Sequence, residues 1–218
     1  MRRRLAVLGD SIAWGQGAAS ARERLAPVLS ERLTARGLAV EARVLARRGA
    51  RSRQLHAQVD RALPWEPDLA LIVIGANDLT HLEPVETAVA ALEVAVRRLR
   101  AVDTEVVVAP APDLSAVPHV PVAMRDVVRA AGDHFRFQQV AAVTAAGGRV
   151  ADPDQRASRA FATDPTLFSS DRFHPSSAGY AVIADALYPA VSEALAASPA
   201  HRSGKHGSRR MRATVSAR

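Results

Sequence analysis

Short apolar runs alternate with longer amphipathic stretches along this chain, and this alternation restricts its fold more than any other feature. Strands are expected at 4–9, 39–45, 68–74, 104–109 and 148–151, and helices at 21–36, 52–62, 84–101, 121–146 and 177–196. The run LALIVI at 69–74 is apolar at every position, as is typical of a parallel strand covered by helices on both faces. The alternation therefore predicts an α/β fold, with a parallel sheet between two layers of helices.

Residues that favour helix ends mark several of these boundaries. Ser52 is expected to act as an N-cap, and Pro84 lies near the start of a helix. Gly37 and Gly147 follow the ends of two others.

One domain, residues 1–197, is expected to contain the whole core. Hydrophobic residues make up 48% of the 218 residues, and no repeat or linker interrupts the alternation before residue 198. The absence of cysteine excludes disulfides and thiolate sites. No metal or organic cofactor is expected, and neither a P-loop nor a dinucleotide-binding glycine pattern is present.

The excess of basic residues is concentrated after the last expected helix. The net charge is +7, but residues 198–218 contain six Lys and Arg and no acid, which leaves 23 basic against 22 acidic residues elsewhere. We expect this polar, aperiodic segment to be a disordered, solvated tail. The alternative is weak contact between the tail and polyanions; specific nucleic-acid binding is not expected.

The N-terminal sequence MRRRLAVLGD begins like a signal peptide. Its apolar stretch, Leu5 to Leu8, is too short for the apolar region of such a peptide. No run approaches the roughly 18 apolar residues of a membrane-spanning helix. A cytoplasmic protein without a membrane span is therefore expected.

Residues that can carry chemistry follow the expected strands directly. They are Asp10 and Ser11 after the first strand, Gly49 after the second, 75–78 after the third and 110–113 after the fourth. The loop SSDRFHPSSAG precedes the last helix. Since ligands bind beyond the carboxyl ends of parallel strands, we expect these segments to meet at one edge of the sheet.

Ser11, His174 and Asp171 together suggest nucleophilic catalysis. Alone, Ser11 is more often a helix cap or loop residue, and His174 a surface histidine. Asp171, three residues before His174, can bind one imidazole nitrogen and leave the other free as a base. A weakly nucleophilic serine requires such a base.

Acyl transfer also requires hydrogen-bond donors for a developing oxyanion. Asn77 follows the strand-end Gly75, which allows a tight turn, and Gly49 lacks a Cβ, so that its backbone N–H can approach a ligand. Taken alone, Asn77 is as readily a turn or cap residue, and Gly49 is more often a turn glycine. Asp78 is expected to orient or cap neighbouring groups rather than to act as an acid.

The blocks GDSIAWGQG, RRGARS, IGAND and DRFHPSSAGY resemble those of the SGNH hydrolases, also called the GDSL esterase/lipase family, over residues 5 to 196. Ile12 stands where the family's name motif has leucine. The resemblance implies a three-layer α/β/α, flavodoxin-like sheet. It also implies that Ser11 is the nucleophile, His174 the base and acid, and Asp171 the residue that orients His174. The oxyanion hole would comprise the backbone N–H groups of Ser11 and Gly49 and the side-chain amide of Asn77.

The sequence is therefore interpreted as a serine hydrolase that cleaves small-molecule carboxylic esters. The alternative is a flavodoxin-like phosphate- or nucleotide-binding module, which would explain the glycines but neither Asp171 nor His174. Residues 110–124 are expected to line the acyl pocket or to be a plain connecting loop. Trp14 and Phe168 are further candidates for its wall.

Overall fold

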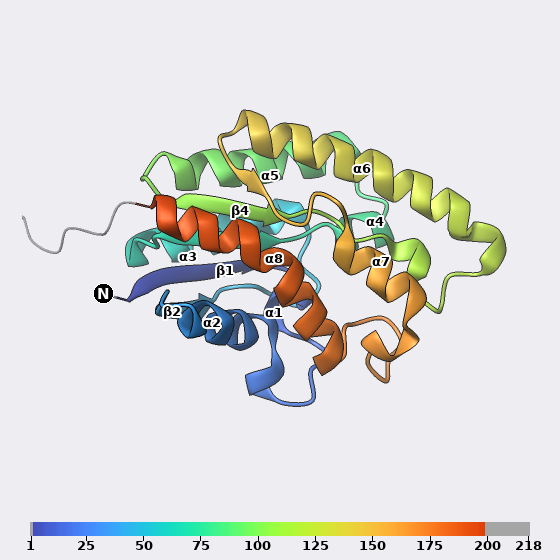
Figure 1. The fold of residues 1–218 in the computed structure, drawn as a ribbon. Helices are drawn as coiled ribbons and strands as arrows, with labels where there is room; N and C mark the ends of the chain where they lie inside the picture. The colour runs from blue at the N-terminus through green and yellow to red at the C-terminus, as the bar shows by residue number, and fades with distance from the viewer. Residues whose placement is uncertain (1, 199–218) are drawn as a thin grey trace, which may run out of the picture.

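Figure 1 shows the computed structural model, which describes residues 2–198, as a five-stranded sheet with helices on both faces. The strands are β1 (Arg3–Gly9), β2 (Val40–Val44), β3 (Leu69–Val73), β4 (Glu105–Ala109) and β5 (Arg149–Val150). All pairs are parallel, in the order β2-β1-β3-β4-β5. This is the flavodoxin-like order, and the predicted three-layer α/β/α fold is confirmed.

Two layers of helices cover the sheet (Figure 1). One face packs against α2 (Leu25–Ala35) and α8 (Ser177–Ala197), and the other against α3 (Leu55–Ala62), α5 (Val85–Arg100) and α6 (Arg125–Ala145). The remaining helices are α1 (Ser11–Trp14), α4 (Ala76–Thr80) and α7 (Arg156–Thr163), with 3₁₀ turns η1 (Ala21–Glu23), η2 (Ser52–Gln54), η3 (Leu63–Trp65), η4 (Leu114–Ala116), η5 (Val122–Met124) and η6 (Pro165–Leu167).

Strand β3 explains why the sheet needs both layers. Leu69 and Leu71 belong to the core on the α2–α8 side, whereas Ala70 and Ile72 belong to the core on the α3–α5 side. All four are fully buried. Burial of each large apolar side chain contributes about 1.5–3 kcal/mol, so an uncovered face would forfeit several such contributions.

The structure differs from the sequence prediction at several element ends. Expected strand 148–151 is reduced to the two residues of β5, and α7 lies in a stretch for which no element was predicted from the sequence. The prediction that Ser52 is an N-cap is wrong: Arg51 occupies that position, and the Ser52 hydroxyl binds Asp78. Pro84 does precede α5, as predicted.

The C-terminal end of the described chain packs on the sheet. Ser198, the first residue of the predicted tail, is buried, and its carbonyl accepts a hydrogen bond of 2.8 Å from Arg3 Nη2. The rest of that predicted tail lies outside the described residues. Among residues 2–198, no helix combines the length and apolar character needed to cross a bilayer.

Candidate active site at the carboxyl edge of the sheet

Ser11 stands at a sharp turn between β1 and α1. Gly9 has φ +129°, and a Cβ there would lie 1.8 Å from the Val73 carbonyl oxygen, so the close packing of β1 on β3 requires glycine. Gln58 of α3 brackets the same residue, accepting from Gly9 N–H at 2.7 Å and donating to its carbonyl at 2.9 Å. Asp10 then caps α1 by accepting from Ile12 N–H at 2.9 Å. These contacts fix Ser11 as the first residue of the helix.

The loop before α8 brings His174 to this serine. Its Nε2 lies 3.1 Å from Ser11 Oγ, and its Nδ1 lies 2.6 Å from Asp171 Oδ2. Ser176 caps α8, accepting from Gly179 N–H at 3.2 Å. The structure therefore brings together the three residues that the sequence predicted as a catalytic chain.

Asp171 is held by more donors than the sequence indicated. Its Oδ1 accepts from Ser169 Oγ at 2.8 Å and from the backbone N–H groups of Phe173 and His174 at 2.9 Å each. Partial burial acts to raise the pKa of Asp171, but the hydrogen bonds from His174, Phe173 and Ser169 outweigh it and hold that pKa below its usual range. The carboxylate therefore stays ionised beside the imidazole at neutral pH. Because it accepts from Nδ1–H, Nε2 of a neutral ring is free to take a proton.

Gly17 allows the two catalytic loops to meet. A Cβ at this position would lie 2.4 Å from the carbonyl oxygen of Pro175 and 3.1 Å from Cβ of His174. The third glycine of the GDSIAWGQG block thus permits the segment after α1 to pass directly against the loop before α8 that carries His174, which we call the histidine loop. Sequence reasoning had assigned it no such role.

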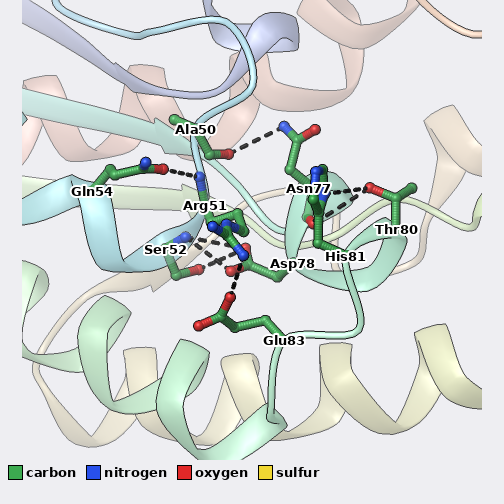
Figure 2. A network of polar contacts seen from close by, with 9 residues as sticks. All are labelled: Ala50, Arg51, Ser52, Gln54, Asn77, Asp78, Thr80, His81 and Glu83. Carbon is green, nitrogen blue, oxygen red and sulfur yellow. Dashed lines mark hydrogen bonds and ion pairs between the residues drawn. The ribbon is translucent and has the colours of Figure 1, made fainter.

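The two loops predicted to supply oxyanion donors, which contain Gly49 and Asn77, lie next to each other and are linked by hydrogen bonds (Figure 2). Asn77, near the start of α4, donates from Nδ2 to the Ala50 carbonyl at 3.1 Å, next to Gly49, whose φ is +73°. An amide carries two N–H groups, and the other makes no hydrogen bond within residues 2–198. Both segments lie at the carboxyl edge where Ser11 stands.

A buried carboxylate fastens these loops to one another. Asp78, 1% exposed, accepts from Ser52 N–H and from Ser52 Oγ at 2.9 Å each (Figure 2). Arg51 and Glu83 form an ion pair of 2.7 Å beside it. Burial raises the pKa of Asp78, although its hydrogen bonds from Ser52 oppose that rise. Asp78 thus orients neighbouring groups, as expected, but its partner Ser52 was not foreseen.

A cleft opens beside Ser11 and His174, with an empty volume of about 580 Å³ that includes solvent at its mouth. We call it the Ser11 cleft. Its walls are mostly apolar and include Leu114, Val117, Phe161, Phe168 and Phe173. Pro112 to Leu114 and Val117, which belong to the segment 110–124, line this cleft; that the segment lines an acyl pocket stays a prediction.

Trp14 is not among the residues that line the Ser11 cleft, so this candidate for its wall is wrong. The indole instead stacks under the guanidinium of Arg24, 4.1 Å from the ring centroid, with Arg48 at 5.4 Å. The attraction between these two guanidinium groups and the ring favours this position of the indole. Among residues 2–198, no group of three or more His, Asp or Glu side chains is placed to hold a metal ion.

The chain is similar to several known proteins. The model of the GDSL-like lipase/acylhydrolase family matches residues 7–182. A GDSL-like esterase of Mycobacterium tuberculosis, Rv1075c, is 38% identical over 200 residues, which cover 88% of this chain and 62% of that protein. The chain thus spans about three fifths of the length of this relative.

Two solved structures share the fold at low sequence identity. The psychrotrophic esterase EstA from Pseudoalteromonas sp., inhibited by monoethylphosphonate, is 17% identical with a TM-score of 0.70, covering 89% of this chain and 99% of its own. A variant of Axe2, an acetyl xylan esterase from Geobacillus stearothermophilus, is 19% identical with a TM-score of 0.69. The match covers 87% of this chain and 94% of the Axe2 chain.

Proposed function

We propose that this chain, which belongs to the GDSL-like lipase/acylhydrolase family, hydrolyses carboxylic esters through an acyl-enzyme formed on Ser11. The observation that carries the proposal is the hydrogen-bonded chain from Ser11 Oγ to His174 Nε2 at 3.1 Å and from His174 Nδ1 to Asp171 at 2.6 Å. Both distances are within the reach required for proton transfer between nucleophile, base and orienting carboxylate.

The first half of the reaction acylates the serine. Ser11 Oγ attacks the ester carbonyl carbon while its proton passes to His174 Nε2, and the carbonyl π electrons move to oxygen. The free N–H of Asn77, with the backbone N–H groups of Ser11 and Gly49, would donate to that oxyanion. When the intermediate collapses, His174 Nε2–H protonates the departing alkoxide, and the acyl group stays on Oγ.

The second half restores the enzyme. Water attacks the acyl carbon and gives a proton to His174 Nε2, and collapse of the intermediate expels Ser11 Oγ, which recovers that proton. Throughout, the ionised Asp171 stabilises the positive imidazolium. The products are one carboxylic acid and one alcohol.

The apolar lining of the Ser11 cleft favours a substrate with an apolar group next to the scissile bond. Phe161 and Phe168 pack edge to face with ring centroids 4.9 Å apart and form one of its walls. No Lys or Arg lines this cleft within the described chain, which weighs against the alternative of a phosphate cradle at Ser11. We therefore propose esters with an apolar acyl group as substrates.

Turnover of p-nitrophenyl butyrate by wild type, Ser11→Ala and Ser20→Ala tests the proposal. Ser20 is the matched control, because it is exposed and its side chain caps no helix. Ser11→Ala should lower kcat by roughly 10⁴-fold or more, with Ser20→Ala unchanged. Turnover by Ser11→Ala within tenfold of wild type would refute a serine mechanism.

A further inference from the structure

A second cavity adjoins the Ser11 cleft and is lined by three arginines. We call it the arginine pocket: Arg125 and Arg129 of α6 and Arg172 of the histidine loop line it. Its empty volume is about 780 Å³, open solvent included. Phe161 and Phe168 line both cavities, so this aromatic pair forms the wall between them.

The pocket carries a positive charge that the protein itself balances only in part. Among the described residues, no carboxylate lines it. Arg129 lies 3.7 Å from Asp113 and 4.0 Å from Asp126, whose side chain is 98% exposed. Within residues 2–198, neither Arg125 nor Arg172 forms an ion pair with a carboxylate, so two guanidinium charges remain uncompensated.

Arg125 has further features that favour an anion beside it. Its Nε is buried and makes no hydrogen bond within the described residues. It is also the first residue of α6, a helix of 21 residues, where the helix dipole is positive. The positive guanidinium of Arg125 and the positive end of the α6 dipole therefore lie close together, and both would stabilise a bound anion.

Arg172 links the pocket to the catalytic residues. It lies between Asp171 and His174 and adopts a left-handed conformation, φ 55°, that is costly for a residue with a Cβ. Its N–H donates to the Ser169 carbonyl at 2.8 Å, and Ser169 Oγ in turn donates to Asp171. An anion bound to the Arg172 side chain would therefore lie against the loop that carries the base.

We propose that the arginine pocket is a binding site for a carboxylate or phosphate group, held by the guanidinium groups of Arg125, Arg129 and Arg172. Guanidinium matches both groups in geometry and binds them through paired, charge-assisted hydrogen bonds. Because the aromatic rings of Phe161 and Phe168 also line the pocket, the group is carried by a small organic anion or by the far end of an ester. A free phosphate ion has the same chemistry. The site goes beyond the proposed hydrolysis, and only one arm of its test depends on that activity.

The first arm measures binding of inorganic phosphate to the full chain by isothermal titration calorimetry at low salt, where screening is weak. Wild type should bind in a saturable manner, and Arg125→Gln should weaken the affinity about tenfold, the loss expected for one charge-assisted hydrogen bond. Arg61→Gln, which removes an exposed arginine of α3 outside the pocket, should leave the affinity unchanged.

The second arm compares kcat/KM for mono-p-nitrophenyl glutarate, which carries a free carboxylate, with its neutral methyl-capped counterpart. If the anionic group belongs to the substrate, Arg125→Gln should lower the anionic-to-neutral ratio about tenfold, and Arg61→Gln should not. If phosphate affinity falls in the variant while the ratio stays constant, the pocket serves a free anion, and the site stands. If the wild-type protein hydrolysed neither ester, the proposed hydrolysis would be refuted, and the result of the phosphate-binding arm would still stand.

The proposal is overturned if Arg125→Gln changes neither phosphate affinity nor the ester ratio, or if wild type shows neither saturable phosphate binding nor an Arg125-dependent ratio. Thermal melting shows whether the variant folds. Should Arg125→Gln fail to fold, Arg129→Gln carries the same measurements, because its side chain is 55% exposed and its replacement disturbs little packing.

Discussion

Replacement of Asp10 by asparagine should make the stability of the protein less dependent on pH. The Asp10 carboxyl is 1% exposed; its Oδ1 accepts from Ile12 N–H at 2.9 Å, and its Oδ2 has no hydrogen-bond partner among the described residues. Burial raises the pKa of Asp10 to about 7, with the Ile12 N–H opposing and the nearby Asp78 carboxylate reinforcing the rise. Asparagine keeps the shape of the protonated acid and cannot ionise.

The direction and size of the effect follow from proton linkage. Above its ordinary pKa of 3.8, the unfolded carboxyl releases its proton, whereas the folded one keeps it until about pH 7. The folded state thus binds more protons in this window, and wild-type stability falls as pH rises until ionisation is complete in both states. Between pH 5 and pH 8 this loss should reach about 3 kcal/mol, at 1.4 kcal/mol per pH unit.

Urea unfolding followed by circular dichroism at pH 5, 6, 7 and 8 measures this difference between wild type and Asp10→Asn. The advantage of the variant should grow with pH, because groups whose pKa does not depend on Asp10, such as Asp171, contribute alike to both proteins. Asp154→Asn, which neutralises an exposed carboxylate, is the control and should show no such growth. A difference between wild type and Asp10→Asn that stays constant from pH 5 to pH 8 would refute the reasoning.

Substitutions at three further positions test the geometry of the site. Asn77→Ala should lower kcat by roughly 10²–10³ with little change in KM, and Asn77→Asp at least as much; unchanged kcat in both would remove Asn77 from the oxyanion hole. Ser52→Ala leaves the buried Asp78 with fewer donors and should lower the free energy of unfolding by about 1–3 kcal/mol, measured in urea; an unchanged value would show that the contact is dispensable. Gly17→Ala should displace the Pro175 backbone and reduce kcat up to roughly 10²-fold, so wild-type kinetics would contradict the close contact.

The parts of the site that the sequence predicted are those set by local geometry. Ser11 and Asn77 follow apolar strands, and parallel strands bring their carboxyl ends to the same edge whatever the details of packing. Asp171 and His174 are three residues apart, so one turn of chain is enough to join them. The pairing of His174 with Ser11, 163 positions away, was predicted because both were expected at that edge and because both match motifs of the family.

The features that sequence reasoning missed depend on contacts between distant residues. Asp78 binds Ser52 across 26 positions, and Gln58 binds Gly9 across 49, so no local pattern signals either pair. Ser52 was assigned to an N-cap because local capping preference is its strongest sequence signal, yet a buried carboxylate competes more strongly for its hydroxyl. Trp14 was predicted only as a candidate for the wall of the pocket, and nothing in the sequence indicates that the fold brings Arg24 over its ring.

Covalent labelling of Ser11 tests the central claim most directly. A fluorophosphonate probe reacts with a serine only when a neighbouring base activates its hydroxyl, and mass spectrometry of the digested protein identifies the modified residue. We predict one adduct on Ser11 in the wild type, none in Ser11→Ala, and much slower labelling in His174→Ala, because the base lies 3.1 Å from the nucleophile. An unlabelled wild type, or an adduct on another serine, would contradict the account.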